Sequence, residues 1–315
     1  MHPVSAATKT VTAPSGATPT AFAALVIANV ALAFGPVFVR LADTGPVAAG
    51  FWRITLAAPV IAVLALGSGW RPGRPVAGNA RGLGWMLAIA GVSFAADLAS
   101  WHLGILRTTL ANATLFGNSA TLIFPLYGFL VARGWPTRSQ GLALLLAAFG
   151  AALLMGQSYR LDPRHLAGDL LCVGAGILYT VYFVCMARAR ATMPPLPALA
   201  LSTIASIGPL LVFALVLGER VMPHDWTPLI ALALISQVIG QGLMIFAIGR
   251  LSPLVIGIAL LIQPIVAATI GWVVYREALT GADWIGAVLV AVALVLVRRA
   301  PRARPDFLDS APPAA

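Results

Sequence analysis

Charged residues are scarce in this chain. Asp, Glu, Lys and Arg make up only 10% of its 315 residues, whereas hydrophobic residues make up 60%. A soluble domain carries roughly a quarter charged residues, so the composition indicates an integral membrane protein whose partner is the lipid bilayer. The net charge is +10. Because the basic residues are scattered between apolar stretches and form no continuous patch, nucleic-acid binding is not expected.

Cysteine and catalytic motifs are scarce as well. The two cysteines, Cys172 and Cys185, lie in one apolar stretch and predict neither a disulfide framework nor a zinc site. The sequence contains no Walker-type phosphate loop, no His-Glu-x-x-His pattern and no Gly-x-Ser-x-Gly turn. An ATP-driven pump or a membrane protease therefore has little support. We expect a protein that is not an enzyme and that holds no cofactor and no metal.

Apolar stretches fill the chain between two polar tails. A bilayer-spanning helix needs about 20 largely apolar residues. Ten stretches approach this length, at residues 21–39, 47–66, 85–105, 109–132, 139–155, 168–187, 196–217, 226–248, 252–275 and 284–297. Residues 1–20 are expected to form a disordered tail without a signal peptide, and residues 298–315 a polar tail. The predicted fold is an all-α membrane protein with ten transmembrane helices.

The distribution of Lys and Arg predicts the orientation of these helices. Thirteen Lys and Arg residues fall in the tails and connections on one side of the predicted spans, and six fall on the other side. Cytoplasmic loops are enriched in Lys and Arg, so both termini are predicted to be cytoplasmic.

The two halves of the chain resemble each other. Arg107 matches Arg250, and Thr137 matches Thr280, at an offset of about 143 residues. Chance similarity between Leu/Ala/Gly-rich helices is the alternative explanation. Five helices per repeat is an odd number, so the second repeat must enter the membrane from the opposite side. We therefore expect one transport domain built from inverted repeats at residues 21–155 and 168–297, with a substrate site near the midplane.

Two charged groups fall well inside the predicted spans. Arg53 lies roughly 10 Å into its helix at ~1.5 Å per residue, and it could bind backbone carbonyls, reach the membrane surface or meet a substrate carboxylate. Asp97 could carry a proton, bind an amino group or be a hydrogen-bonded structural residue. A polar group at membrane depth is costly and normally faces the bundle interior or a watery cavity. His102, close to the end of the same span, is expected to be an interfacial residue.

Neutral polar and aromatic residues mark the interior faces of several spans. Ser93, Asp97 and Trp101 share one helical face, and Gln237 and Gln241 share a face of the eighth span, so a two-fold axis would bring these faces together. The remaining candidates within the spans are Asn29, Asn112, Ser119, Tyr179, Tyr182 and Gln263. Aromatic groups and amides with few charges suit a small amphipathic or aromatic solute, although helix packing would also use aromatic side chains.

Two prolines are expected to interrupt their helices. Pro36 follows Gly35 in the first span and predicts a kink there. Pro264 follows Gln263 in the ninth span, and its missing amide hydrogen leaves a backbone carbonyl free.

Over roughly residues 20–298 the chain resembles the EamA-type, ten-helix members of the drug/metabolite transporter superfamily. The residues that carry the resemblance are Phe51-Trp52-Arg53, Arg107 with residues 109–113, Arg250-Leu251-Ser252-Pro253, Gln263-Pro264, Glu277-Ala278-Leu279-Thr280 and Gly286. The first half departs from this pattern. Residues 133–137 lack the family's Glu, and Pro125 is displaced by about one turn relative to Pro264.

The resemblance implies a transporter that works by alternating access. Within the superfamily the chain is most similar to the YddG-type exporters of aromatic and other neutral amino acids, which implies the bacterial inner membrane. Trp101, Tyr179 and Tyr182 would then contact the side chain of the solute, and its polar end would be held by Asn112, Ser119, Gln241 and Gln263. Structural or gating roles would fall to Arg53, Pro36, Pro264 and Glu277.

Other functions remain open from the sequence. Efflux of drugs or other amphipathic metabolites would use a similar cavity, whereas a non-transporting membrane scaffold would not need polar faces at the midplane. The solute, its direction of transport and proton coupling through Asp97 are undecided. Small-residue faces serve contacts within and between chains alike, so they leave the oligomeric state open, and a monomer is only the working expectation.

Overall fold

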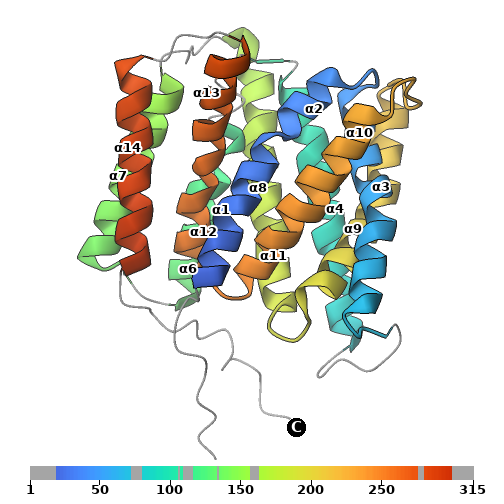
Figure 1. Ribbon diagram of the computed structural model, residues 1–315, viewed down its shortest axis with the longest axis horizontal. Coiled ribbons are helices and arrows are strands. Elements are labelled where there is room, and N and C mark those ends of the chain that lie inside the picture. The colour runs from blue at the N-terminus through green and yellow to red at the C-terminus, as the bar shows by residue number, and fades with distance from the viewer. Residues whose placement is uncertain are drawn as a thin grey trace, which may run out of the picture.

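The structure is a computed structural model that describes residues 19–71, 80–105, 107–108, 116–132, 135–156, 163–275 and 280–299, and these residues form a bundle of helices (Figure 1). The first half contains α1 (Pro19–Ala33), α2 (Gly35–Leu41), α3 (Pro46–Gly67), α4 (Ala80–Ile105), α6 (Ala120–Ala132) and α7 (Arg138–Gly156). The second half contains η1 (Pro163–His165), α8 (Leu166–Ala189), α9 (Pro195–Val216), α10 (Thr227–Ala231), η2 (Leu232–Gln241), α11 (Gly242–Ile248), α12 (Pro253–Leu260), α13 (Ile262–Tyr275) and α14 (Gly281–Arg299).

Long apolar helices make this a multi-pass membrane protein. Within the described residues, six helical segments are long and apolar enough to cross a membrane, at Pro19–Leu41, Pro46–Gly67, Arg81–Gly104, Leu166–Ala189, Pro195–Val216 and Thr227–Ile248. Four shorter apolar helices lie at Ala120–Val131, Arg138–Leu153, Pro253–Val266 and Trp284–Val297. Each of these segments coincides with one of the stretches predicted from the sequence. The count of ten membrane crossings stays a prediction, since residues 109–115 of the fourth stretch lie outside the described part.

The two prolines stand where their helices are interrupted. α1 ends at Ala33 and α2 begins at Gly35, so the break falls directly before Pro36 and the predicted kink is confirmed. In the ninth stretch the break falls at Leu261, between α12 and α13, and Pro264 lies in the first turn of α13. Proline cannot donate a backbone hydrogen bond, and its ring clashes with the carbonyl of the fourth preceding residue.

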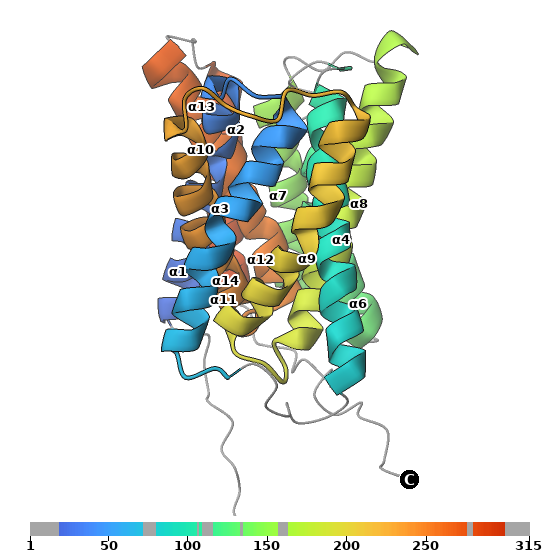
Figure 2. The ribbon, with the colours of Figure 1, turned by 90° about the vertical axis from the view of Figure 1, so that its right-hand side faces the viewer.

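Each main helix–helix contact joins the first half of the chain to the second. α4 lies against α8 and α9, α3 against α9, α6 against α12, and α7 against α14. α1 lies against η2 and α11 (Figures 1 and 2). The halves are therefore interleaved in one body. α1 begins and α14 ends at the same face of the bundle (Figure 1), although the compartment that this face meets stays a prediction.

Glycine allows a close backbone approach at two of these helix contacts. A Cβ atom placed on Gly150 of α7 would lie 2.8 Å from the backbone oxygen of Gly286 in α14. A Cβ atom on Gly257 of α12 would lie 2.7 Å from the backbone oxygen of Thr121 in α6. Helices in a membrane associate through such close packing, because the surrounding lipid is as apolar as the helices and provides no hydrophobic driving force.

Candidate functional site

Polar and aromatic side chains from α3, α4, α8 and η2 meet inside the bundle. We name this group the central cluster, and it consists of Arg53, Phe94, Asp97, Tyr179, Tyr182, Gln237 and Gln241. α3 and α4 come from the first half of the chain, and α8 and η2 from the second. The cluster therefore brings together six of the predicted residues, namely Arg53, Asp97, Tyr179, Tyr182, Gln237 and Gln241, and it depends on contacts between the halves.

A hydrogen-bonded chain fixes the guanidinium of Arg53. Its Nε donates to Oε1 of Gln237 at 3.1 Å, and Nε2 of Gln237 donates in turn to Oγ1 of Thr203 at 3.5 Å. Gln237 is completely buried. Arg53 is thus held inside the bundle by α9 and η2, and it does not extend to the membrane surface as one of the sequence interpretations allowed.

Asp97 faces Arg53 across a gap. The two charges interact electrostatically, yet no ion pair within 4.0 Å joins them, and none of the described residues forms a hydrogen bond with the Asp97 carboxylate. Both side chains keep part of their surface accessible although they face each other across α3 and α4. The cluster is more charged than the nearly uncharged cavity expected from the sequence.

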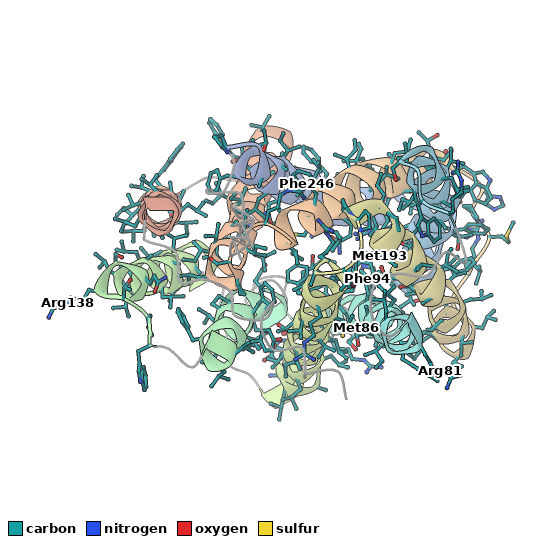
Figure 3. All side chains as sticks on the ribbon, turned by 90° about the horizontal axis from the view of Figure 1, so that it is seen from below. Arg81, Met86, Phe94, Arg138, Met193 and Phe246 are labelled. Atoms are coloured by element: carbon teal, nitrogen blue, oxygen red, sulfur yellow. The ribbon has the colours of Figure 1, made fainter. Side chains whose placement is uncertain are left out.

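Three aromatic rings form one side of the central cluster. Phe94 stacks on Tyr182 with ring centroids 4.7 Å apart, and Tyr179 stacks on Tyr182 at 6.0 Å. Cζ of Arg53 lies 5.7 Å from the centre of the Phe94 ring, a cation–π distance. Figure 3 shows Phe94 inside the bundle, whereas Arg81 and Arg138 lie at its edge. The sequence interpretation missed Phe94, although it precedes Asp97 by three residues and so shares its helical face.

A π-helix presents the two glutamines of the cluster. η2 runs for 10 residues with π-type geometry, which the sequence pattern did not predict. π-helical turns are rare and often occur at functional sites. The hydroxyl of Tyr179 donates to Oε1 of Gln241 at 3.4 Å. Nε2 of Gln241 and the hydroxyl of Tyr182 are buried without a hydrogen-bond partner of good geometry among the described residues.

The remaining predicted residues fall into smaller groups. Nε2 of Gln263 donates to Oδ1 of Asn29 at 3.0 Å, which ties α13 to α1. Ser93 is buried on α4. Trp101 lies against Gly117, where a Cβ atom would come within 2.7 Å of its indole nitrogen, and Ser119 lies against Gly176 of α8.

Asn112 and Glu277 lie outside the described residues. His102 was expected at the membrane interface, and this is wrong, because its side chain is only 3% exposed. It lies close to Gly50 of α3, where a Cβ atom would come within 3.7 Å of its Cε1. The position of His102 near the end of α4 gave no indication that α3 covers it.

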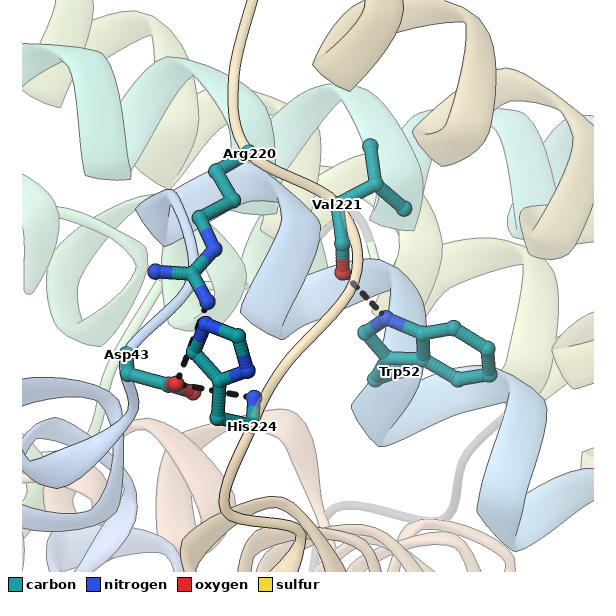
Figure 4. Close-up of polar contacts among 5 residues, drawn as sticks. All are labelled: Asp43, Trp52, Arg220, Val221 and His224. Atoms are coloured by element: carbon teal, nitrogen blue, oxygen red, sulfur yellow. Dashed lines mark hydrogen bonds and ion pairs between the residues drawn. The ribbon is translucent and has the colours of Figure 1, made fainter.

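On one face of the bundle the α9–α10 connection closes over the start of α3. We call this arrangement the loop contact (Figure 4). Its members are Asp43, Gly45, Ala48, Trp52, Glu219, Arg220, Val221, His224 and Trp226. Oδ2 of Asp43 accepts the backbone N–H of His224 at 2.8 Å and lies 3.6 Å from Nη2 of Arg220. The His224 N–H, assisted by the Arg220 charge, lowers the pKa of Asp43 below its ordinary value of 3.8.

Backbone and indole groups complete the loop contact. Oε2 of Glu219 accepts the backbone N–H of Ala48 at 2.8 Å, and the backbone oxygen of Arg220 accepts the N–H of Gly45 at 3.0 Å. The indole of Trp52 donates to the backbone oxygen of Val221 at 2.7 Å. Trp52 also meets Trp226 edge to face, with ring centroids 4.8 Å apart. The contact therefore ties the second half of the chain to the first at this face.

The opposite face has its own fastening at the end of α8. Nε of Arg190 donates to the backbone oxygen of Ile245 at 3.1 Å, and its Nη1 donates to the backbone oxygen of Met193. Burial, with a smaller effect from Arg250, lowers the pKa of Arg190 to about 10. Arg190 stays charged at neutral pH and holds the α8–α9 connection against the end of α11.

Comparison with known proteins agrees with this fold. A solved structure, described only as the crystal structure of a protein, matches 90% of this chain and 98% of its own chain, with 18% sequence identity and a TM-score of 0.73. At this identity the likeness shows the fold alone. No curated protein sequence matches the chain. Residues 166–299 match the model of the EamA-like transporter family. This match supports membership of the drug/metabolite transporter superfamily, and with it a membrane transporter of small solutes.

Proposed function

We propose that this protein is a secondary transporter that exports neutral and aromatic amino acids, and similar small amphipathic solutes, across the bacterial inner membrane by alternating access. The central cluster is the observation that carries this proposal. It combines a stacked aromatic surface of Phe94, Tyr179 and Tyr182 with the buried amides of Gln237 and Gln241. Aromatic surface with a few placed polar groups is typical of a site for a small solute.

The helix contacts support two inverted repeats, at residues 21–155 and 168–297, that form one transport domain. Under a two-fold axis in the membrane plane, α4 would correspond to η2 and α11, and α8 would correspond to α1. The contact between α4 and α8 would then have its counterpart in the contact of η2 and α11 with α1. It would relate α3 to α9, α6 to α12 and α7 to α14, and each of these pairs is in contact. Transporters with such repeats bind their solute near the midplane between the halves. Because the central cluster is complete within one chain, a monomer suffices.

Alternating access requires each face to open in turn. The loop contact fastens one face and Arg190 fastens the other. With cytoplasmic termini, as the basic residues predict, the loop contact lies on the outer face. Release of a solute to the outside would then require the loop contact to separate while Arg190 keeps its bonds.

Transport by the purified protein in proteoliposomes tests this proposal. We expect saturable uptake of labelled Phe, Trp, Met or Leu, and an imposed pH gradient shows whether the flux is proton-coupled. Tyr182→Ala and Trp101→Ala should lower the flux without loss of folded protein. If the folded protein moves no amino acid but moves amphipathic drugs, efflux of such compounds replaces this proposal. If it moves neither class, a non-transporting role replaces it.

Proton coupling has a separate test at Asp97. If Asp97 carries the proton, Asp97→Asn should remove the response of the flux to the pH gradient. An unchanged response in this variant rejects proton coupling through Asp97.

A further inference from the structure

We propose that Arg53 and Asp97 bind the two charged ends of a zwitterionic α-amino acid, with its carboxylate on Arg53, its ammonium on Asp97 and its side chain against Phe94 and Tyr179. This inference rests on the proposed transport function and specifies which solutes the central cluster selects. A solute with both charges at one end, and an apolar group at the other, matches the groups that face one another in the cluster.

The charged groups of Arg53 and Asp97 are separated from each other. Only Nε of Arg53 is bonded to a described residue, and the Asp97 carboxylate has no such bond. A charge at membrane depth is costly unless it is paired and hydrogen-bonded. A direct ion pair would satisfy both groups, yet they remain more than 4.0 Å apart. A molecule that carries one negative and one positive group satisfies both charges at once.

Gln237 fixes the orientation of the Arg53 guanidinium. Gln237 occupies the Nε side of Arg53 and is itself held by Thr203, so the two Nη groups are the donors left for a ligand. A guanidinium recognises a carboxylate through two parallel hydrogen bonds, which an ammonium cannot form. The fixed position of Arg53 therefore favours a planar carboxylate.

Aromatic and polar side chains surround Arg53 in the central cluster. Phe94 lies 5.7 Å from Cζ of Arg53 and stacks on the rings of Tyr179 and Tyr182, so Arg53 and the aromatic surface are adjacent. Nε2 of Gln241 is fully buried without a hydrogen-bond partner among the described residues, and the buried hydroxyl of Tyr182 lies near Ser202 and Gln241 without a full hydrogen bond to either. These groups offer further hydrogen bonds to a polar solute. A monocationic drug would pair with Asp97 and leave Arg53 unpaired.

A crossed comparison of ligands and variants tests this inference. Three probes compete against labelled L-phenylalanine in proteoliposomes, namely L-phenylalanine itself, phenethylamine, which lacks the carboxylate, and 3-phenylpropionate, which lacks the amine. For the wild-type protein we expect each analogue to bind roughly tenfold or more weakly than phenylalanine, because it leaves one buried charge unpaired. Arg53→Met should weaken phenylalanine and phenylpropionate about tenfold or more and leave phenethylamine unchanged. Asp97→Asn should weaken phenylalanine and phenethylamine and leave phenylpropionate unchanged.

Controls separate ligand binding from folding. Arg81→Met makes the same substitution at an exposed arginine at the edge of the bundle and should change no affinity. Arg53→Lys keeps the positive charge but cannot form two parallel hydrogen bonds to a carboxylate. It replaces Arg53→Met in the test if that variant does not fold. Its phenylalanine affinity should fall while its phenethylamine affinity stays unchanged. Ligand-induced shifts in the thermal midpoint of the detergent-solubilised protein measure binding independently of transport.

The outcomes distinguish this inference from the proposed function. An equal loss of affinity for all three probes in Arg53→Met or Arg53→Lys indicates a structural role for Arg53 and overturns the inference. An Asp97→Asn variant that loses only its response to a pH gradient, with unchanged phenethylamine affinity, assigns Asp97 to proton transfer and also overturns it. If the wild-type protein moves phenylalanine without the crossed pattern, only the inference fails. If it moves no amino acid, the proposed function and the inference fail together.

Discussion

The carboxylate of Glu219 caps α3 from a distant part of the chain, and its removal should loosen the N-terminal end of that helix. The first turn of α3 has unpaired N–H groups, and its N-cap residue Gly45 has no side chain to bind them. Oε2 of Glu219 accepts the N–H of Ala48 at 2.8 Å instead. A charged acceptor at a helix N-terminus is worth about 1–2 kcal/mol, from the hydrogen bond and the helix dipole together.

Glu219→Ala should therefore increase local opening of the loop contact roughly tenfold, since about 1.4 kcal/mol corresponds to a factor of ten. Hydrogen exchange of the peptide that covers residues 46–52, measured by mass spectrometry in nanodiscs, reports this opening. Glu219→Gln keeps an acceptor oxygen but loses the charge, so its exchange should rise less. Gly45→Ala should act like Glu219→Ala, because a Cβ atom there would overlap the Glu219 side chain.

A neighbouring cap supplies the control for this experiment. Oδ1 of Asp225 accepts the N–H of Thr227 at 2.9 Å at the start of α10. Asp225→Ala, which removes this acceptor, should raise exchange in residues 227–231 and leave residues 46–52 unchanged. If exchange of residues 46–52 in Glu219→Ala stays within about twofold of the wild type, a change of less than ~0.5 kcal/mol, Glu219 does not stabilise α3 and the reasoning fails.

Three further predictions concern other parts of the molecule. The pKa of Asp43 is lowered below 3.8, so the ionised carboxylate should stabilise the loop contact above pH 4, and this stability should be lost as the pH falls through the folded-state pKa. Hydrogen exchange of residues 46–52 should therefore rise as the pH is lowered through this range. The Asp43→Asn variant should not show this pH dependence. Gly257→Ala should lower the thermal midpoint, because the added Cβ would overlap Pro125 and overpacking costs about 1–3 kcal/mol of stability. Gly208→Ala should leave the midpoint unchanged, because no atom lies within 4 Å of the added Cβ. Equal midpoints for the two variants would contradict the close α6–α12 contact. Tyr182→Phe should leave the thermal midpoint nearly unchanged, because it keeps the stacked ring and removes a hydroxyl that lies near Ser202 and Gln241 without a full hydrogen bond to either. A clearly lower midpoint would show that the hydroxyl is bonded in the folded protein.

Local features of the chain were predictable because their physical causes are local. An apolar stretch of membrane length must form a helix, since lipid offers no partner for backbone N–H and C=O groups. The predicted stretches accordingly match the observed helices, and the break before Pro36 lies where the proline ring demands it. Arg53 and Asp97 could be selected as candidates for the same reason, because a charge at membrane depth is rarely retained without a role.

The partners of these residues could not be predicted from the sequence. Arg53 and Gln237 are 184 residues apart, and Ala48 and Glu219 are 171 apart. Helical periodicity shows which residues share a face, but it does not show which helix covers that face or at what rotation. His102 was misplaced for this reason, and Phe94 was overlooked because an isolated phenylalanine in an apolar helix resembles any core residue.

The sequence alone therefore determined where the membrane helices run, where prolines interrupt them and which polar groups must avoid lipid. Only the tertiary structure decided which of these groups meet, because the interleaving of the two halves sets the rotation of each helix. It brings Arg53 of α3 to Gln237 of η2 and leaves Asp97 of α4 facing Arg53 without a bond. Short-range forces fix the helices, whereas the central cluster depends on packing between segments that are distant in the chain.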